Sequence, residues 1–252
     1  MRAFVIALGF IALSSLFTLQ AQSPSDNPEV AARTLTQRML SAMSHRDVDA
    51  LAAMFKFPVS VRSGGVTIPI GNRAALEKAF DTVFTPELGC ALERSLQPSD
   101  GAGDAVRKDG ESLSIGRGAV HLQPSGPSFV IARIDEPAGA APAAPRAQPR
   151  RVDVPSGQVQ FAGTLAVGGA DRYVVPVRQG DVLQARVERF QGRAIGVRVV
   201  DAKTGRVLST GADTARVVSV TAPQPGDVAV DVTRLTFCEP SETYLLTLSK
   251  RR

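Results

Sequence analysis

The chain of 252 residues contains no tryptophan and only two tyrosines, two cysteines and two histidines. So few cysteines and histidines exclude a disulfide-dense mini-protein and leave little material for a metal site built from them. The sequence also lacks the HExxH, GxSxG, GxGxxG and P-loop motifs, which are short signatures of zinc proteases, serine hydrolases and nucleotide-binding proteins. We therefore predict no metal, no cofactor and no catalytic residues.

A basic patch with interleaved aromatic residues is missing too, although the formal net charge is +5. Residues 22–136 hold 12 Lys and Arg against 14 Asp and Glu, and residues 152–249 hold ten of each sign. The positive excess comes from arginines in 137–151 and from the final three residues, 250–252. Since the globular parts are close to neutral, the sequence predicts no nucleic-acid partner.

The N-terminus has the pattern of a secretory leader. Arg2 supplies a positive charge, Phe4 to Leu19 is mostly apolar, and Ala21 offers a small residue for cleavage. An uncleaved anchor is the alternative, but sixteen residues with three hydroxyls are short for a span of about 20 residues. We predict a signal peptide over 1–21, a periplasmic or secreted protein, and no membrane span after cleavage.

A segment rich in proline and alanine divides the rest of the chain. Residues 137–151 read PAGAAPAAPRAQPRR, with four prolines and no large apolar residue. Prolines at this density break both helix and sheet, so this segment is predicted to be a linker. It separates a domain over 22–136 from a domain over 152–252.

The first domain begins with helix signals and ends with strand signals. Asn27 is a candidate cap, and Leu35, Met39 and Met43 recur every four residues. Asp47 is a candidate cap for a helix that ends near Phe55. Asn72 is a candidate cap for a helix that carries Leu76 to Phe84, and Thr85 for a helix that reaches Arg94. Alternation predicts strands over 57–62, 66–70, 119–122 and 128–132, and a loop over 97–111. This order is typical of an α+β domain.

The second domain reads almost entirely as strands. Alternation and turn residues recur every 8–15 positions, and no helix of useful length fits. The predicted strands cover 159–164, 173–177, 182–190, 194–200, 217–221, 228–232 and 244–248. Such spacing indicates an all-β sandwich.

The first domain resembles the nuclear-transport-factor-2-like (SnoaL-like) superfamily. The similarity is carried by the two opening helices and by FKFPVSVR, TIPIGNRAALEKAFDTVFTPEL, GRGAVHL and SFVIARID. It covers about 110 residues and implies a cone-like α+β fold with a pocket. Members include enzymes and many non-catalytic binding domains, so the resemblance fixes no activity.

The second domain resembles the pre-peptidase C-terminal (PPC) type of secreted β-sandwich. The similarity is carried by Gly163, Asp171, Tyr173, Gly180-Asp181, VRVVD at 197–201, Gly205, PGD at 225–227 and YLL at 244–246. Val228 stands where family members often have tyrosine. The resemblance implies a jelly-roll-like accessory module that is not itself catalytic.

Candidate site residues are few. His121 lies on a predicted strand opposite Val120 and Leu122, so it faces either a pocket or solvent, and solvent is favoured. If it faced the cone, Arg62 or Asp81 would act with it as a polar anchor for a ligand. His45 is expected in a solvated connection between helices. Five phenylalanines would line a cavity or simply pack the core, and packing is favoured: Phe55, Phe57, Phe80, Phe84 and Phe129.

Cys90 and Cys238 form an even pair in a compartment where disulfides persist. They lie in different predicted domains, and the sequence leaves open whether they are bonded or remain two buried thiols. A bond between them would close a loop of about 150 residues and contribute up to about 4–5 kcal/mol.

These observations favour an exported, non-enzymatic binding or adaptor protein of the bacterial envelope. Its partner would be a small molecule or an envelope component. One alternative is a small-molecule enzyme using the cone cavity. The other is cell-surface or glycan binding by the sandwich, through arginines around one predicted hairpin: Arg186, Arg189, Arg193 and Arg198.

Overall fold

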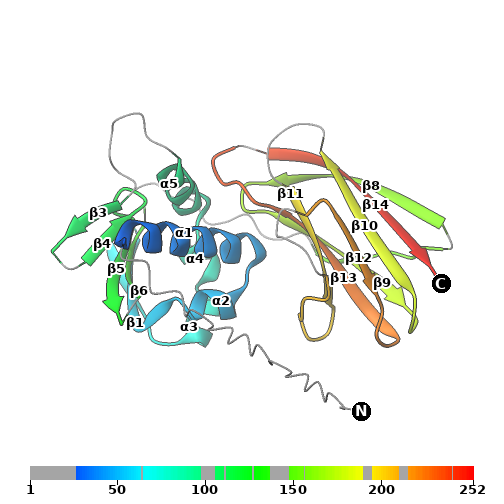
Figure 1. Ribbon diagram of the computed structural model, residues 1–252, viewed down its shortest axis with the longest axis horizontal. Helices are drawn as coiled ribbons and strands as arrows, with labels where there is room; N and C mark the ends of the chain where they lie inside the picture. The colour runs from blue at the N-terminus through cyan, green and yellow to red at the C-terminus, as the bar shows by residue number, and fades with distance from the viewer. Residues whose placement is uncertain are drawn as a thin grey trace, which may run out of the picture.

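The computed structural model describes residues 27–63, 65–97, 106–110, 112–126, 128–136, 148–155, 157–189, 195–209, 215–239 and 241–252. They form a half of helices and one sheet, and a second half of strands, side by side (Figure 1). The predicted leader over 1–21 lies outside the described residues. In the part of the chain that is described, no helix is both long and apolar enough to cross a membrane.

The described residues of the first half form five helices, and four of these start at the predicted caps. The side chains of Asn27, Asp47, Asn72 and Thr85 accept backbone N–H bonds at the starts of four of them. The helices are α1 (Pro28–His45), α2 (Val48–Ala52), α3 (Arg73–Lys78), α4 (Phe80–Val83) and α5 (Pro86–Leu96).

The predicted third helix is divided in two. Ala79 has φ −91° and ψ 4°, which is a turn conformation, and it separates α3 from α4. Phe80 is buried there, and its ring centroid lies 4.8 Å from that of Phe84. We attribute the break to this packing, because tertiary contacts override weak helix propensity.

The sheet of the first half has the strand order β2-β1-β6-β5-β4-β3. Neighbouring strands are antiparallel except β1 and β6, which are parallel. The strands are β1 (Phe55–Ser63), β2 (Val66–Ile70), β3 (Val106–Asp109), β4 (Ser112–Ile115), β5 (Val120–Ser125) and β6 (Ser128–Asp135). Strand β3 corrects the loop predicted over 97–111: it is a short, charged edge strand that depends on pairing with β4 rather than on its own apolar pattern.

The second half consists of two four-stranded sheets, ordered β12-β10-β14-β8 and β11-β13-β9-β7. The prediction of a sheet-rich second half is therefore confirmed. Its strands are β7 (Arg150–Arg151), β8 (Gly157–Ala166), β9 (Ala170–Val177), β10 (Val182–Arg189), β11 (Ile195–Asp201), β12 (Val217–Thr221), β13 (Gly226–Arg234) and β14 (Ser241–Arg251). Residues 137–147 of the predicted linker lie outside the described residues, and its last two residues form β7, parallel to β9.

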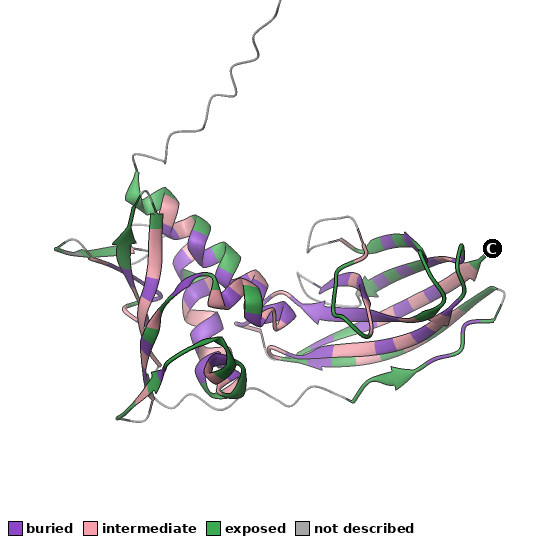
Figure 2. Ribbon diagram, turned by 90° about the horizontal axis from the view of Figure 1, so that it is seen from below, coloured by how far each residue is buried: buried purple, intermediate pink, exposed green. Residues whose placement is uncertain are grey.

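Each half has its own hydrophobic core, and buried positions alternate along strands such as β9, β12 and β14, whereas β13 is buried along most of its length (Figure 2). One residue crosses the boundary: Phe237 follows β13 in the chain but belongs to the core of the first half. The two cores are therefore distinct, and Phe237 is one point at which the halves meet.

Candidate functional site

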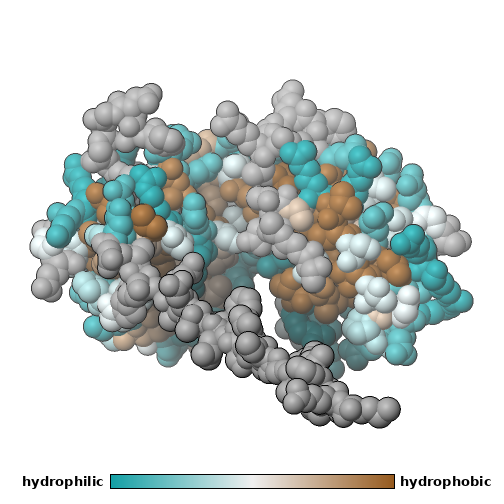
Figure 3. All heavy atoms as spheres, viewed as in Figure 1, coloured by the Kyte–Doolittle hydropathy of each residue, from teal (hydrophilic) through white to brown (hydrophobic). Residues whose placement is uncertain are grey.

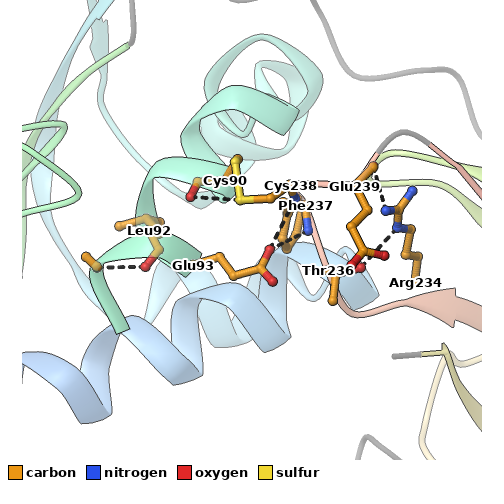
Figure 4. The surroundings of a disulfide bond; sticks show 9 residues. Cys90, Leu92, Glu93, Arg234, Thr236, Phe237, Cys238 and Glu239 are labelled. Carbon is orange, nitrogen blue, oxygen red and sulfur yellow. Dashed lines mark hydrogen bonds between the residues drawn. A yellow bond between two sulfur atoms is a disulfide. The ribbon is translucent and has the colours of Figure 1, made fainter. Parts of the chain in front are cut away.

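The two halves are joined by a disulfide between Cys90 on α5 and Cys238 after β13 (Figure 4). The S–S distance is 2.15 Å and the Cα–Cα distance is 4.6 Å. Glu93, one turn further along α5, accepts the backbone N–H groups of Phe237 at 2.7 Å and Cys238 at 3.2 Å. The segment 237–238 is therefore held by a covalent bond and by a charged acceptor, which makes stronger hydrogen bonds than a neutral one.

The ring of Phe237 packs directly on the backbone of Gly89. A Cβ atom added at Gly89 would lie 2.3 Å from Cδ1 of Phe237. No residue with a side chain fits there unless the ring moves, although glycine inside a helix costs about 0.5–1 kcal/mol relative to alanine. We infer that Gly89 serves this contact between the halves.

We expect Gly89→Ala to destabilise the protein by about 1–3 kcal/mol, because overpacking a buried contact outweighs the gain in helix propensity. Chemical denaturation of both forms measures the difference. In the double variant Gly89→Ala/Phe237→Ala the collision is absent, so the alanine at 89 should cost much less there. A Gly89→Ala protein as stable as the wild type would contradict the role of this contact.

A second contact links the sandwich to the end of α1. Arg198 on β11 donates to the carbonyl oxygen of His45 at 3.1 Å, and its Nε lies 3.6 Å from the buried carboxylate of Asp231. Asp231 also accepts two bonds from Arg172, at 2.6 and 2.8 Å, and this carboxylate raises the pKa of Arg172. A cation at the last carbonyls of a helix is favoured by the helix dipole.

His45 corrects the prediction of a solvated residue. It is the last residue of α1 and is 5% exposed. Its Nδ1 lies 2.9 Å from the carbonyl oxygen of Ser41, one turn earlier. The burial of His45 comes from a residue distant in the chain, Arg198, and so cannot be read from the local pattern around position 45.

Beside the disulfide lies a cavity of about 560 Å³. One wall is a single face of α5, the second is the turn between β4 and β5, and the third is the end of β6. The lining residues are Glu87, Cys90, Ala91, Arg94, Gly116, Arg117, Gly118, Ala119, Asp135 and Glu136. Glu87, Cys90, Ala91 and Arg94 follow the i, i+3, i+4, i+7 spacing of one helix face, a signal that the sequence analysis did not use.

The turn in this wall has an uncommon backbone. Gly116, Arg117 and Gly118 have φ values of 62°, 60° and 89°. A left-handed conformation is unusual for arginine, and such residues concentrate at binding sites. The turn brings Arg117 to the cavity, which the Gly-Arg-Gly sequence alone did not indicate.

Asp135 connects the cavity to the predicted site residue His121. Its Oδ2 lies 2.7 Å from Nε2 of His121 and 3.1 Å from Nε of Arg133. Its Oδ1 lies 4.0 Å from Nε of Arg62 and makes no hydrogen bond to any described residue. The structure thus places His121 and Arg62 around one carboxylate that the sequence analysis did not single out.

Asp81, the third predicted residue of that group, lies elsewhere. It forms an ion pair with Arg46, with Nη2 donating to Oδ2 at 3.0 Å. Arg46 ends α1 in a left-handed conformation, and its guanidinium lies 4.4 Å from the centroid of the Phe80 ring. Asp81 therefore holds a helix end in place.

The predicted aromatic lining packs instead with the core of the first half. Phe55, Phe80 and Phe84 are buried in it, and Phe57 and Phe129 pack against it in part. None of the five lines the cavity beside the disulfide.

The arginines proposed for glycan binding do not share a hairpin. Strand β10, which carries Arg186, and strand β11, which carries Arg198, belong to different sheets. Arg193 lies outside the described residues. Arg186 pairs with Glu188 at 3.1 Å, and Arg198 faces α1. Figure 3 shows hydrophobic side chains gathered on the visible face of the sandwich half. Two valines of this half, Val207 and Val217, are each 49% exposed.

The groups that could take part in chemistry at this site are already engaged with one another. A general base needs a ring nitrogen directed at substrate. Nε2 of His121 lies 2.7 Å from both Asp135 and Arg133, and Nδ1 lies 3.3 Å from Arg133. Both cysteines are bonded. Among the described residues, no three of His, Cys, Asp and Glu lie together as a metal site would need.

No family model matches this chain, and no curated protein matches it. Among solved structures it is similar to PliG of Aeromonas hydrophila, a periplasmic inhibitor of g-type lysozyme, with 11% identity and a TM-score of 0.33 over 41% of this chain and all of that one. It is also similar to the pre-peptidase C-terminal domain of a Bacillus anthracis collagenase, with 15% identity and a TM-score of 0.33 over 43% of this chain and 98% of that one. A mutant of PliG from Escherichia coli gives 13% identity and a TM-score of 0.33 over 43% of this chain and all of that one.

Proposed function

We propose that this chain is an exported, non-enzymatic binding protein of the bacterial envelope whose ligand occupies the cavity beside the disulfide. The observation that carries the proposal is that four charged side chains line this cavity and form no ion pair within 4.0 Å with any described residue: Glu87, Arg94, Arg117 and Glu136. An ionised side chain without a partner in a concave site can form a charge-assisted hydrogen bond with a ligand of opposite charge.

The rigid connection of the two halves supports binding rather than turnover. Cavity residues on α5 lie next to Cys90, which is bonded to the second half, and Glu93 holds the same segment. A preorganised site loses less entropy when it binds a ligand. His121 has both ring nitrogens facing Arg133 or Asp135.

Export is supported by two independent features of the chain. Residues 1–21 have the pattern of a cleaved leader. The Cys90–Cys238 bond is of the kind that persists in oxidising compartments and is rare in the cytosol.

We further propose that the first half is a nuclear-transport-factor-2-like cone and the second a PPC-like, jelly-roll-like sandwich. The order β2-β1-β6-β5-β4-β3, with β1 parallel to β6 and α1 leading, supports the former. For the latter, four residues that carry the resemblance, Gly163, Asp171, Tyr173 and Tyr244, meet in one cluster: Tyr244 contacts the other three.

Fractionation of the cells tests export. We expect the protein in the periplasmic or secreted fraction, with a mature N-terminus close to residue 22 by mass spectrometry. The protein should take up two alkyl groups only after reduction, because both of its cysteines are held in one disulfide. A cytosolic protein that begins at Met1 would overturn this part of the proposal.

Native mass spectrometry tests binding. The protein purified from its own host should carry a small molecule that dissociates on unfolding. Asp135→Asn removes the charge at the cavity and should remove the bound mass, whereas Asp81→Asn, in an ion pair away from the cavity, should retain it. Absence of any bound mass in the wild type, or its retention in Asp135→Asn, would contradict the proposed site.

A further inference from the structure

The cavity carries charges of both signs that do not neutralise each other. Arg94 and Arg117 line it together with Glu87, Asp135 and Glu136. Among the described residues, the side chains of Arg94, Arg117, Glu87 and Glu136 form no ion pair within 4.0 Å and no hydrogen bond. Opposite charges that share a cavity of about 560 Å³ without pairing must lie apart around it.

The spacing of these charges along α5 gives a length. Glu87 and Arg94 lie on one face of the helix, seven residues apart. At a rise of about 1.5 Å per residue, their Cα atoms are separated by about 10 Å along the helix axis. An extended chain spans about 3.3–3.6 Å per residue, so three residues span the same distance.

From these observations we infer that the ligand is a short zwitterionic peptide, about three residues long, with a free ammonium group at one end and a free carboxylate at the other. This inference rests on the proposed binding function. The ammonium group pairs with the carboxylate of Glu87, and the ligand carboxylate accepts the guanidinium N–H groups of Arg94. The cavity volume is within the range of about 300–1,000 Å³ that is usual for ligand sites.

Each end of such a ligand has a distinct role. Glu87 would discriminate against an acetylated N-terminus, which has no charge and fewer donors. Arg94 would discriminate against a C-terminal amide. A single amino acid spans about 3 Å, which is shorter than the distance between these two positions along α5.

Isothermal titration calorimetry with trialanine tests the inference on the mature, disulfide-bonded chain. We expect wild-type protein to bind trialanine, and N-acetyl-trialanine, trialanine amide and alanine to bind about tenfold or more weakly, since a charge-assisted hydrogen bond is worth about 1.5–3 kcal/mol. Glu87→Gln should weaken trialanine binding about tenfold and weaken the acetylated peptide little further. Arg94→Gln should weaken trialanine binding about tenfold and weaken the binding of trialanine amide little further.

The matched controls are Glu29→Gln and Arg33→Gln, which change an exposed ion pair on α1 at 3.1 Å; both should bind trialanine as the wild type does. Equal affinity for trialanine and its capped forms, or undiminished affinity in both cavity variants, would overturn the inference. A host molecule retained in native mass spectrometry that is not a zwitterion would overturn the ligand class alone. The absence of both a retained molecule and trialanine binding would overturn the proposed function as well.

Discussion

Replacing Cys90 and Cys238 together by serine should lower the free energy of unfolding by about 4–5 kcal/mol. The bond joins residues 148 positions apart, and in the chain-entropy model a loop of this length restricts the unfolded chain by about that amount. Urea denaturation followed by far-UV circular dichroism measures the change in stability. The loss should be accompanied by a change in the shape of the transition.

The shape should change because the two hydrophobic cores are separate. With the disulfide intact, the halves are coupled through Phe237 and Glu93, and one transition is expected. Without the bond, each half can unfold at its own denaturant concentration. The wild type under reducing conditions is the control and should behave as the double variant does. A double variant with one transition at the wild-type midpoint would contradict this account of the junction.

Local signals in the sequence were sufficient for most elements. Caps such as Asn27 and Asn72 act within three residues of themselves, so their hydrogen bonds follow from the sequence. Alternation is equally local, and it located most strands of both halves. Strands β3, β4 and β7 were not predicted; β3 and β7 are each stabilised by a neighbouring strand and not by their own pattern, and β4 is only four residues long.

The candidate site was harder to predict because it depends on contacts between distant segments. His121 and Arg62 were singled out, but Asp135, which joins them, is the last residue of β6 and resembles an ordinary strand end. Glu87 and Arg94 lie on one face of α5, and only the tertiary fold shows that this face borders a cavity. The burial of His45 depends on the second half in the same way.

Raising the pH should leave both tyrosines un-ionised until the protein unfolds. Tyr173 and Tyr244 are the chain's two tyrosines, and both are fully buried. Their hydroxyl oxygens lie 2.7 Å apart, and Tyr244 donates to Asp171 at 2.5 Å. Burial raises the pKa of Tyr173, and burial together with the bond to Asp171 raises the pKa of Tyr244 far above its usual range. Absorbance at 295 nm should therefore stay flat well past pH 10.

The same shifts make stability depend on alkaline pH. Below about pH 10 the tyrosines are neutral in both the folded and the unfolded chain, so their contribution is fully present. Above that pH the unfolded chain ionises and the folded chain does not, so stability falls by about 1.4 kcal/mol per pH unit for each tyrosine. Absorbance at 295 nm and far-UV circular dichroism should therefore change together in one cooperative step.

A tyrosine placed on the surface provides the control for this titration. Gln158→Tyr adds a phenol at an exposed position of β8, and this phenol should ionise near pH 10 in a protein that is still folded, as one third of the final absorbance change. Tyr244→Phe should leave a single late-ionising group, because Tyr173 remains buried on the same core. If the wild type ionised near pH 10 while its circular dichroism was unchanged, the phenols would be accessible to solvent, and the cluster that ties Gly163, Asp171, Tyr173 and Tyr244 together would not be closed as the structure has it.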